Sequence, residues 1–270
     1  MKKFRKFNSL LLIIVSLVLA PLAGCEKDDE GTPPQLPPPS SFNIDFSDFT
    51  EETKSQYAND TYIHRGYALL NVAVWNTIIQ LHLAIPVAAF NEAFNHTPVP
   101  QADGSWLWSY DVEVGINTFT ANLYAMNNGN TVEWSMYISK TGQNPYTDFL
   151  WFSGISHLDR TQGEWTLYKS PNENIPYVGI EWFTNGDENA EITYTNIVPD
   201  GPENGGYIKY GRTAEVPYNA FYDIFNKGED NLTEIEWDTI TKAGRIKDPK
   251  AFGNDAFYCW DSTGADTECP

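Results

Sequence analysis

Four histidines are the side chains best suited to proton transfer or metal binding in this chain, and they are widely spaced: His64, His82, His96 and His157. Histidine titrates near neutral pH and is a common metal ligand, so each is a candidate. None belongs to a His-x-x-x-His or Cys-x-x-Cys pattern, the spacings that zinc sites use. The sequence therefore predicts no metal site and no cofactor.

Two of these histidines have acidic neighbours at a usable spacing. Glu92 and His96 are four residues apart, so on a helix they share a face and could seat a metal or form a catalytic pair. His157 precedes Asp159 and Arg160 at the end of an expected strand, where a general base is conceivable. We favour the plainer interpretations, which are a solvated pair at a helix end and a polar turn.

Three carboxylates alternate along another expected strand: Glu234, Glu236 and Asp238. Carboxylate oxygens bind Ca²⁺, but the favoured interpretation is the solvent-facing side of an antiparallel sheet. No Gly-x-Ser-x-Gly, Walker or dinucleotide-binding motif occurs. We therefore predict no catalytic residue and favour a non-enzymatic protein, with a hydrolase of unrecognised class as an alternative.

The central element is an uncharged stretch from Gly66 to Asn91, which contains no Asp, Glu, Lys or Arg. We predict a helical segment over residues 61–96, apolar nearly all round and therefore buried in the domain. Pro86 lacks an N–H, so we expect a kink there or a break that opens a second helix. A membrane-spanning helix is the alternative, but Asn, Gln and His residues interrupt the stretch.

The polar members of this helix have two interpretations. His82 is best explained as a core histidine that is hydrogen-bonded within the domain. If the domain wraps the helix loosely, the same face lines a ligand pocket instead. The candidate lining residues are Trp75, Ile79 and His82 from the helix, with Trp151 from an expected strand.

Short strands with period-two alternation fill residues 105–261. Trp106, Trp108 and Tyr110 alternate with polar residues, for example, and Asn-Gly turns separate several of the runs. We predict a mainly β fold with a helix (α+β), in which an antiparallel up-and-down meander of about ten strands curls as a half-barrel around the helix. In outline this architecture is similar to the half-barrel lipoproteins that carry or hold lipids.

The N-terminus has the pattern of a secretory signal. Basic residues precede a short apolar run, and Leu22, Ala23, Gly24 and Cys25 follow it. This tetrad resembles the lipobox of bacterial lipoproteins, a family in which the Cys is acylated and becomes the first residue of the mature chain. An ordinary thiol at Cys25 is the alternative.

The residues after Cys25 are acidic and then proline-rich. Lys27, Asp28 and Asp29 resemble the signal that exports some lipoproteins to the outer face of the outer membrane, and a solvated charge run is the alternative. Residues 31–41 hold five prolines, which favours a semi-rigid spacer. We therefore expect a signal peptide over 1–24, a tether over 25–41 and a single β-rich domain over 42–270.

Charge and cysteine content fit an exported protein. Residues 1–24 hold four basic residues and no acidic one, so their removal leaves 13 basic against 36 acidic residues, a formal charge of −23. Such a charge argues against nucleic acid as a partner. If Cys25 carries lipid, Cys259 and Cys269 remain as a pair in an oxidising compartment and are expected to form a disulfide, with free thiols as the alternative.

Our leading hypothesis is a lipid-anchored outer-membrane protein that faces the cell exterior and shelters an apolar ligand between sheet and helix. The periplasmic face is the alternative location. Nine Trp, fifteen Tyr and fifteen Phe also allow a second hypothesis, a glycan-binding or adhesion module that uses exposed aromatic rings. The expected partners are therefore membrane lipid through the acyl anchor and an apolar small molecule or a glycan.

Overall fold

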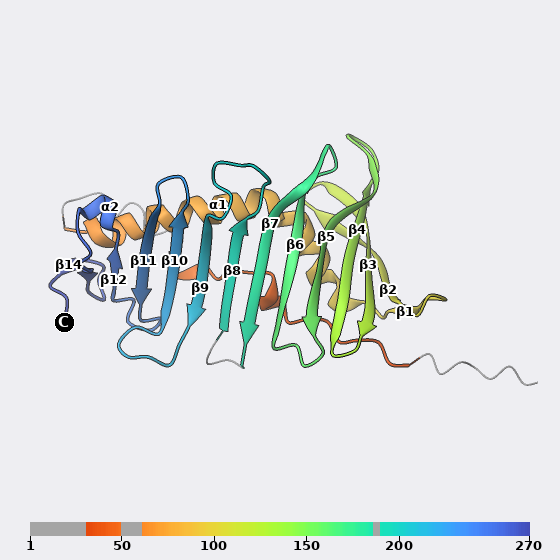
Figure 1. The fold of residues 1–270 in the computed structure, drawn as a ribbon, viewed down its shortest axis with the longest axis horizontal. Coiled ribbons are helices and arrows are strands. Elements are labelled where there is room, and N and C mark those ends of the chain that lie inside the picture. The colour runs from red at the N-terminus through yellow and green to blue at the C-terminus, as the bar shows by residue number, and fades with distance from the viewer. Residues whose placement is uncertain (1–30, 50–60, 186–189) are drawn as a thin grey trace, which may run out of the picture. The chain divides into compact units, whose positions relative to one another are not determined.

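Fourteen antiparallel strands form one sheet in the described part of the chain, and each strand is hydrogen-bonded to the next along the sequence (Figure 1). The computed structural model describes residues 31–49, 61–185 and 190–270. Residues from Thr32 onward belong to one compact unit. The expected class is confirmed, since the unit is mainly β, an antiparallel meander accompanied by a helix.

The strands are β1 (Val99–Pro100), β2 (Trp106–Val114), β3 (Asn117–Asn128), β4 (Thr131–Lys140), β5 (Tyr146–His157), β6 (Gln162–Ser170), β7 (Glu173–Thr184), β8 (Ala190–Asn196), β9 (Tyr207–Arg212), β10 (Ala220–Asn226), β11 (Asn231–Trp237), β12 (Gly244–Lys247), β13 (Tyr258–Trp260) and β14 (Asp266–Thr267). The helices are η1 (Pro39–Ser41), η2 (Ser47–Phe49), α1 (Ile63–Glu92), η4 (Ala93–Asn95) and α2 (Pro249–Phe252). The described residues thus form more strands than the ten or so expected, because β1, β12 and β14 are too short to show a period-two pattern.

The strands have one covered and one open face. In β2 the predicted alternation is confirmed: Trp106, Trp108, Tyr110 and Val112 are buried, and the residues between them are half-buried or exposed. Successive side chains on a strand point to opposite faces of the sheet, so this pattern means that only one face carries the core. Residues 217–226, whose apolar pattern fits either a helix or a strand, contribute strand β10.

Helix α1 runs without interruption from Ile63 to Glu92, so of the two outcomes expected at Pro86, a kink or a break, the break is wrong. Pro86 is buried, as are Leu83 and Phe90 on either side of it. Tertiary packing can override the low helix propensity of one residue, and we attribute the continuity of α1 to this packing.

Helix α1 crosses the strands from one end of the sheet to the other (Figure 1). Its backbone lies near β12, β13 and β14 at its start and near β2 at its end, and its Phe90 side chain also contacts β5 and β6. Thirty residues at about 1.5 Å each give a helix of about 45 Å. The ten strand spacings from β12 to β2, at about 4.8 Å each, give about 48 Å. The helix therefore has the length needed to bridge most of the sheet.

Residues 32–49 cover the face of the sheet between the strands that the two ends of α1 contact. We name this segment the N-terminal strap. Its buried members are Pro34, Pro37, Ser41, Phe42, Ile44, Phe46 and Phe49. Residues 32–41, which the sequence assigns to the expected tether over 25–41, belong to this packed unit. Proline is apolar and needs no partner for an N–H, so a proline-rich segment can pack against a sheet face without joining its ladder.

Buried aromatic side chains of the sheet hold the strap by hydrogen bonds. The indole of Trp165 donates to the carbonyl of Ser41 at 3.1 Å, and that of Trp237 donates to the Asp48 carboxylate at 2.8 Å. The hydroxyl of Tyr194 donates to the carbonyl of Phe42. Buried carbonyls need donors, and a strap outside the ladder must obtain them from side chains. The strap is thus an integral layer of the fold.

Helix α1 is buried on one side only, which corrects the expectation that it is enclosed. Ala68, Leu69, Val72, Leu83, Ala89 and Phe90 are buried. Four other apolar residues, which we name the apolar stripe, lie on the exposed side: Leu70, Val74, Ile78 and Leu81, with exposures of 63, 59, 36 and 74%. By length and composition residues 63–95 could cross a membrane, yet the buried side of this helix belongs to the core of the sheet. The rest of the described chain therefore leaves the apolar stripe uncovered.

Candidate functional site

A groove of about 540 Å³ lies between α1 and the ends of the strands from β8 to β11. We name it the α1 groove, and its volume falls in the range of about 300–1,000 Å³ that small-molecule sites occupy. It is lined by Tyr67, Asn71, Val74, Trp75 and Ile78 of α1, and by Asn196, Glu203, Gly206, Ile224, Phe225, Asn226, Glu229, Asn231, Thr233, Asp248, Lys250 and Ala251. Sequence positions far apart thus meet along one edge of the sheet.

The apolar side of the groove continues the apolar stripe. Val74 and Ile78 belong to both, and Trp75 is half-buried beside them. On the facing strand, Ile224 is buried and Phe225 is half-buried. An alkyl chain in the groove would contact Val74, Trp75 and Ile78 and could extend along the helix.

One end of the groove is fixed by Asp248, which is almost fully buried. Its carboxylate accepts hydrogen bonds from Asn231 Nδ2 at 2.8 Å, from Thr233 Oγ1 at 2.7 Å and from Tyr67 Oη at 2.9 Å. The backbone N–H groups of Lys250 and Ala251 donate as well, because Asp248 caps α2. Burial alone would raise the pKa of this carboxyl, but the hydrogen bonds outweigh it and lower the pKa. Asp248 thus ties α1, β11 and α2 together as an anion.

The other polar side chains of the groove are partly used by local turns. Asn196 Oδ1 accepts from the N–H of Val198, and Asn226 Oδ1 accepts from the N–H of Glu229, each at 3.0 Å. Glu203 accepts from the N–H of Gly228 at 3.1 Å. These bonds fix the β8–β9 connection and the β10–β11 hairpin at the edge of the groove.

The predicted lining residues are not brought together in one cavity. Trp75 lines the α1 groove, whereas Ile79 is half-buried and packs against the core. His82 is exposed, with its ring 5.1 Å from that of Tyr177. Trp151 is buried on β5. Asn196 and Asn226 were missed because each is the last residue of its strand, and sequence alone does not show that the ends of these two strands face one helix.

The candidate catalytic and metal-binding groups are engaged in local interactions. His96 pairs with Glu92 at 3.1 Å and stacks on Tyr110 with ring centroids 4.6 Å apart. Glu234 pairs with Lys247, and His157 bonds to Gln162. The remaining two carboxylates behave likewise, since Glu236 pairs with Arg245 and Asp238 accepts from the N–H groups of its own turn. In the part of the chain that the structure describes, no group of three or more His, Cys, Asp or Glu side chains is placed to hold a metal ion.

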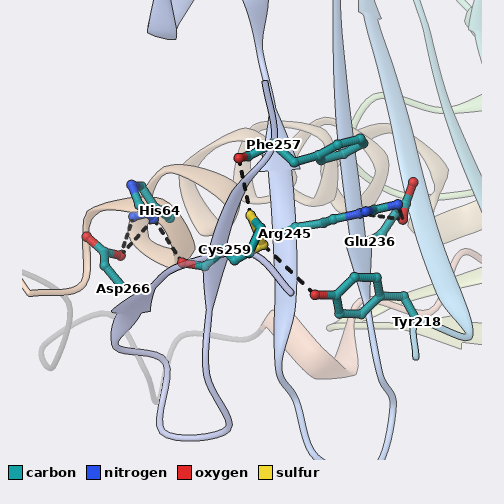
Figure 2. The surroundings of a disulfide bond; sticks show 8 residues. His64, Tyr218, Glu236, Arg245, Phe257, Cys259 and Asp266 are labelled. Carbon is teal, nitrogen blue, oxygen red and sulfur yellow. Dashed lines mark hydrogen bonds and ion pairs between the residues drawn. A yellow bond between two sulfur atoms is a disulfide. The ribbon is translucent and has the colours of Figure 1, made fainter. Parts of the chain in front are cut away.

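Cys259 and Cys269 form a disulfide at the C-terminal end of the sheet (Figure 2). The loop that it closes carries Asp266, whose carboxylate accepts the backbone N–H groups of Ile63 and His64 at 3.1 and 3.0 Å. Asp266 also pairs with the His64 side chain, which in turn contacts the carbonyl of Cys259 at 2.9 Å (Figure 2). A carboxylate at this position satisfies free N–H groups at the start of α1 and complements the helix dipole. The disulfide loop therefore fixes one end of α1 to the sheet.

A second cleft lies on the open face of the sheet, over β2 to β5, with a volume of about 560 Å³. Tyr124 and Tyr137 line it, with ring centroids 5.9 Å apart in an edge-to-face pair. Asn122 and Ser135 are among the polar residues beside them. This cleft combines aromatic rings with neutral hydrogen-bonding groups and with three carboxylates, those of Asp103, Glu133 and Asp148.

The expected lipidation site Cys25 and the export signal Lys27, Asp28 and Asp29 lie outside the described residues. Comparison with known proteins adds no assignment: no family model, no curated protein and no solved structure matches this chain.

Proposed function

We propose that this chain is a lipid-anchored exported protein that binds a largely apolar ligand in the α1 groove. In this proposal Cys25 carries the acyl anchor, the protein resides at the outer membrane, and the sheet curls as a half-barrel with α1 on its inner side. The proposed role is non-enzymatic.

The observation that carries the proposal is the continuity of the α1 groove with the apolar stripe. Val74 and Ile78 are exposed on a helix that has no charged residue between Gly66 and Asn91, in a chain of strongly negative charge. Burial of apolar groups is worth about 0.8 kcal/mol for each methylene removed from water. An alkyl chain along Val74, Trp75 and Ile78 would cover the surface that the fold leaves exposed.

The ligand site differs from the space first expected behind the helix. Over β5 and β6 that space is occupied by Phe42, whose ring lies 4.6 Å from Phe90 and 4.7 Å from Phe152. The strap thus fills the middle of the layer, and the α1 groove lies farther along the helix, near β10 and β11.

The test is binding of an alkyl ligand to the chain from residue 25 to 270 carrying Cys25→Ser, which removes any acyl group of its own. We expect saturable binding with a negative heat capacity change by titration calorimetry, because apolar surface is buried. The paired changes Val74→Asp and Ile78→Asp should abolish it, whereas Ile116→Asp, at a fully exposed turn position, should not. Equal binding by the groove variant and the control would refute the proposal.

A second candidate function is glycan binding at the cleft over β2 to β5. The observation that favours it is the pair Tyr124 and Tyr137 beside Asn122 and Ser135 on an open face. A glycan array should then give signals that Tyr137→Ala removes and that Phe183→Ala, at an exposed aromatic residue of β7 outside the cleft, leaves intact. An array without signals would count against this candidate.

A further inference from the structure

The polar edge of the α1 groove contains hydrogen-bonding groups that the fold does not use. Asn196 and Asn226 each use Oδ1 for a turn, and neither Nδ2 group has a hydrogen bond among the described residues. Asn71 has the opposite arrangement, since its Nδ2 donates to the carbonyl of Tyr67 at 3.0 Å and its Oδ1 makes no bond there. The groove thus offers two neutral donors and at least one neutral acceptor.

The charged side chains that line the groove carry a net negative charge. Glu203, Glu229 and Asp248 face a single cation, Lys250, which pairs with Glu229. Asp248 already accepts five hydrogen bonds and is almost fully buried, so it is not free to bind a ligand. Glu203 remains beside the groove with one N–H donor as its partner.

These groups discriminate between head groups of an amphiphile. A carboxylate or phosphate head would accept from the amides but would be repelled by Glu203 and Glu229. An ammonium head would be attracted by the carboxylates, yet it carries three donors and no acceptor, so it cannot satisfy Asn196 and Asn226. A hydroxyl both donates and accepts, and it carries no charge. The head group that matches all the free atoms is therefore neutral and hydroxyl-rich.

We infer that the α1 groove binds a glycolipid-type amphiphile, with an alkyl chain on Val74, Trp75 and Ile78 and an uncharged sugar head near Asn71, Asn196 and Asn226. This inference rests on the proposed function and adds the ligand class. Trp75 supports it further, because an indole has a broad apolar face beside a polar atom and suits the boundary between chain and head.

The test compares three ligands that share one chain: dodecyl maltoside, dodecanoate and dodecylamine, each titrated below its micelle concentration into the chain from residue 25 to 270 with Cys25→Ser. The maltoside should bind at least tenfold more tightly than either charged ligand. Maltose alone should bind far more weakly, because it lacks the chain.

Isosteric variants identify the contribution of the head group. Asn196→Asp and Asn226→Asp keep the Oδ1 acceptor that each turn needs and remove the Nδ2 donor. Together they should weaken maltoside binding at least tenfold and change dodecylamine binding in the opposite direction. Asn219→Asp is the matched control and should change neither affinity, because Asn219 Oδ1 likewise accepts a backbone N–H, that of Thr239 at 2.9 Å, and Asn219 lines neither the groove nor the open-face cleft.

The outcomes separate this inference from the function on which it rests. If all three amphiphiles bind equally and the Asn variants have no effect, the sugar head is refuted while binding in the groove stands. If none of them binds, the proposed function fails as well. Tighter binding of dodecanoate or dodecylamine than of the maltoside would also overturn the inference.

Discussion

The strap can be tested as a structural layer by truncating Phe42. Its side chain has no exposed surface, and its ring lies 4.6, 4.7 and 4.8 Å from the rings of Phe90, Phe152 and Trp165. A buried Phe→Ala change costs about 3–5 kcal/mol, through lost burial and the cavity left behind. For a unit of this size each kcal/mol lowers Tm by roughly 2–4 °C, so Phe42→Ala should lower it by about 6–20 °C.

The assay is urea unfolding followed by tryptophan fluorescence, with a thermal scan beside it. Asn43→Ala is the matched control, because Asn43 is the next residue and is exposed. It should stay within about 0.5 kcal/mol of the parent, as most surface substitutions do. If Phe42→Ala is as stable as Asn43→Ala, residues 32–49 are not a layer of the fold and the reasoning fails.

Four further variants probe other parts of the fold by urea unfolding. Asp223 lies opposite Glu234. Burial of the Asp223 carboxyl, and after it the charge of Glu234, raises the pKa of Asp223. Because the ionised form of Asp223 is disfavoured in the folded state, the free energy of unfolding falls as the pH rises through the folded-state pKa. Asp223→Asn should therefore stabilise the protein at pH 7, and a gain that persists well below pH 3.8 would contradict this. Asp248→Ala should destabilise by several kcal/mol at pH 7, since five donors lose their acceptor, and a loss under about 1 kcal/mol would show that the network is dispensable. Cys269→Ser should lower the free energy of unfolding by roughly 3 kcal/mol or less, because it opens a loop of sequence separation 10. Asp266→Ala should lower it by about 0.5–2 kcal/mol, because the start of α1 loses its cap. Full stability in both variants would contradict the conclusion that the disulfide loop fixes one end of α1.

The strands were predictable wherever one face is buried along several residues. In β2 and β4 the aromatic and aliphatic residues alternate with polar ones, and that alternation has a direct physical cause in the pleat. β12 was not predictable, because Gly244–Lys247 is held by its neighbours on both sides and has too few residues for a pattern.

The position of the helix in the chain was predictable, but which of its residues are exposed was not. A helix that carries no charge on any side gives no signal of which side faces water. The exposed residues Leu70 and Val74 look the same in sequence as the buried Leu69 and Val72. Their difference arises from the sheet and the strap, which cover only one side of α1.

The strap and the polar edge of the α1 groove could not be predicted from the sequence, for a related reason. Prolines 34 and 37 are typical of a spacer, yet both are buried on the sheet. Asn196 and Asn226 are typical of turns, and they do serve turns through Oδ1. Only the order of the strands brings the two turns to the same edge beside Asn71.

Photo-crosslinking with an alkyl maltoside that carries a reactive group in its chain tests the site most directly. Peptide mapping by mass spectrometry should place the label within residues 67–78 of α1 and residues 224–226 of β10, and unlabelled dodecyl maltoside should compete for it. Labelling spread over the molecule, or confined to the open face over β2 to β5, would contradict binding in the α1 groove.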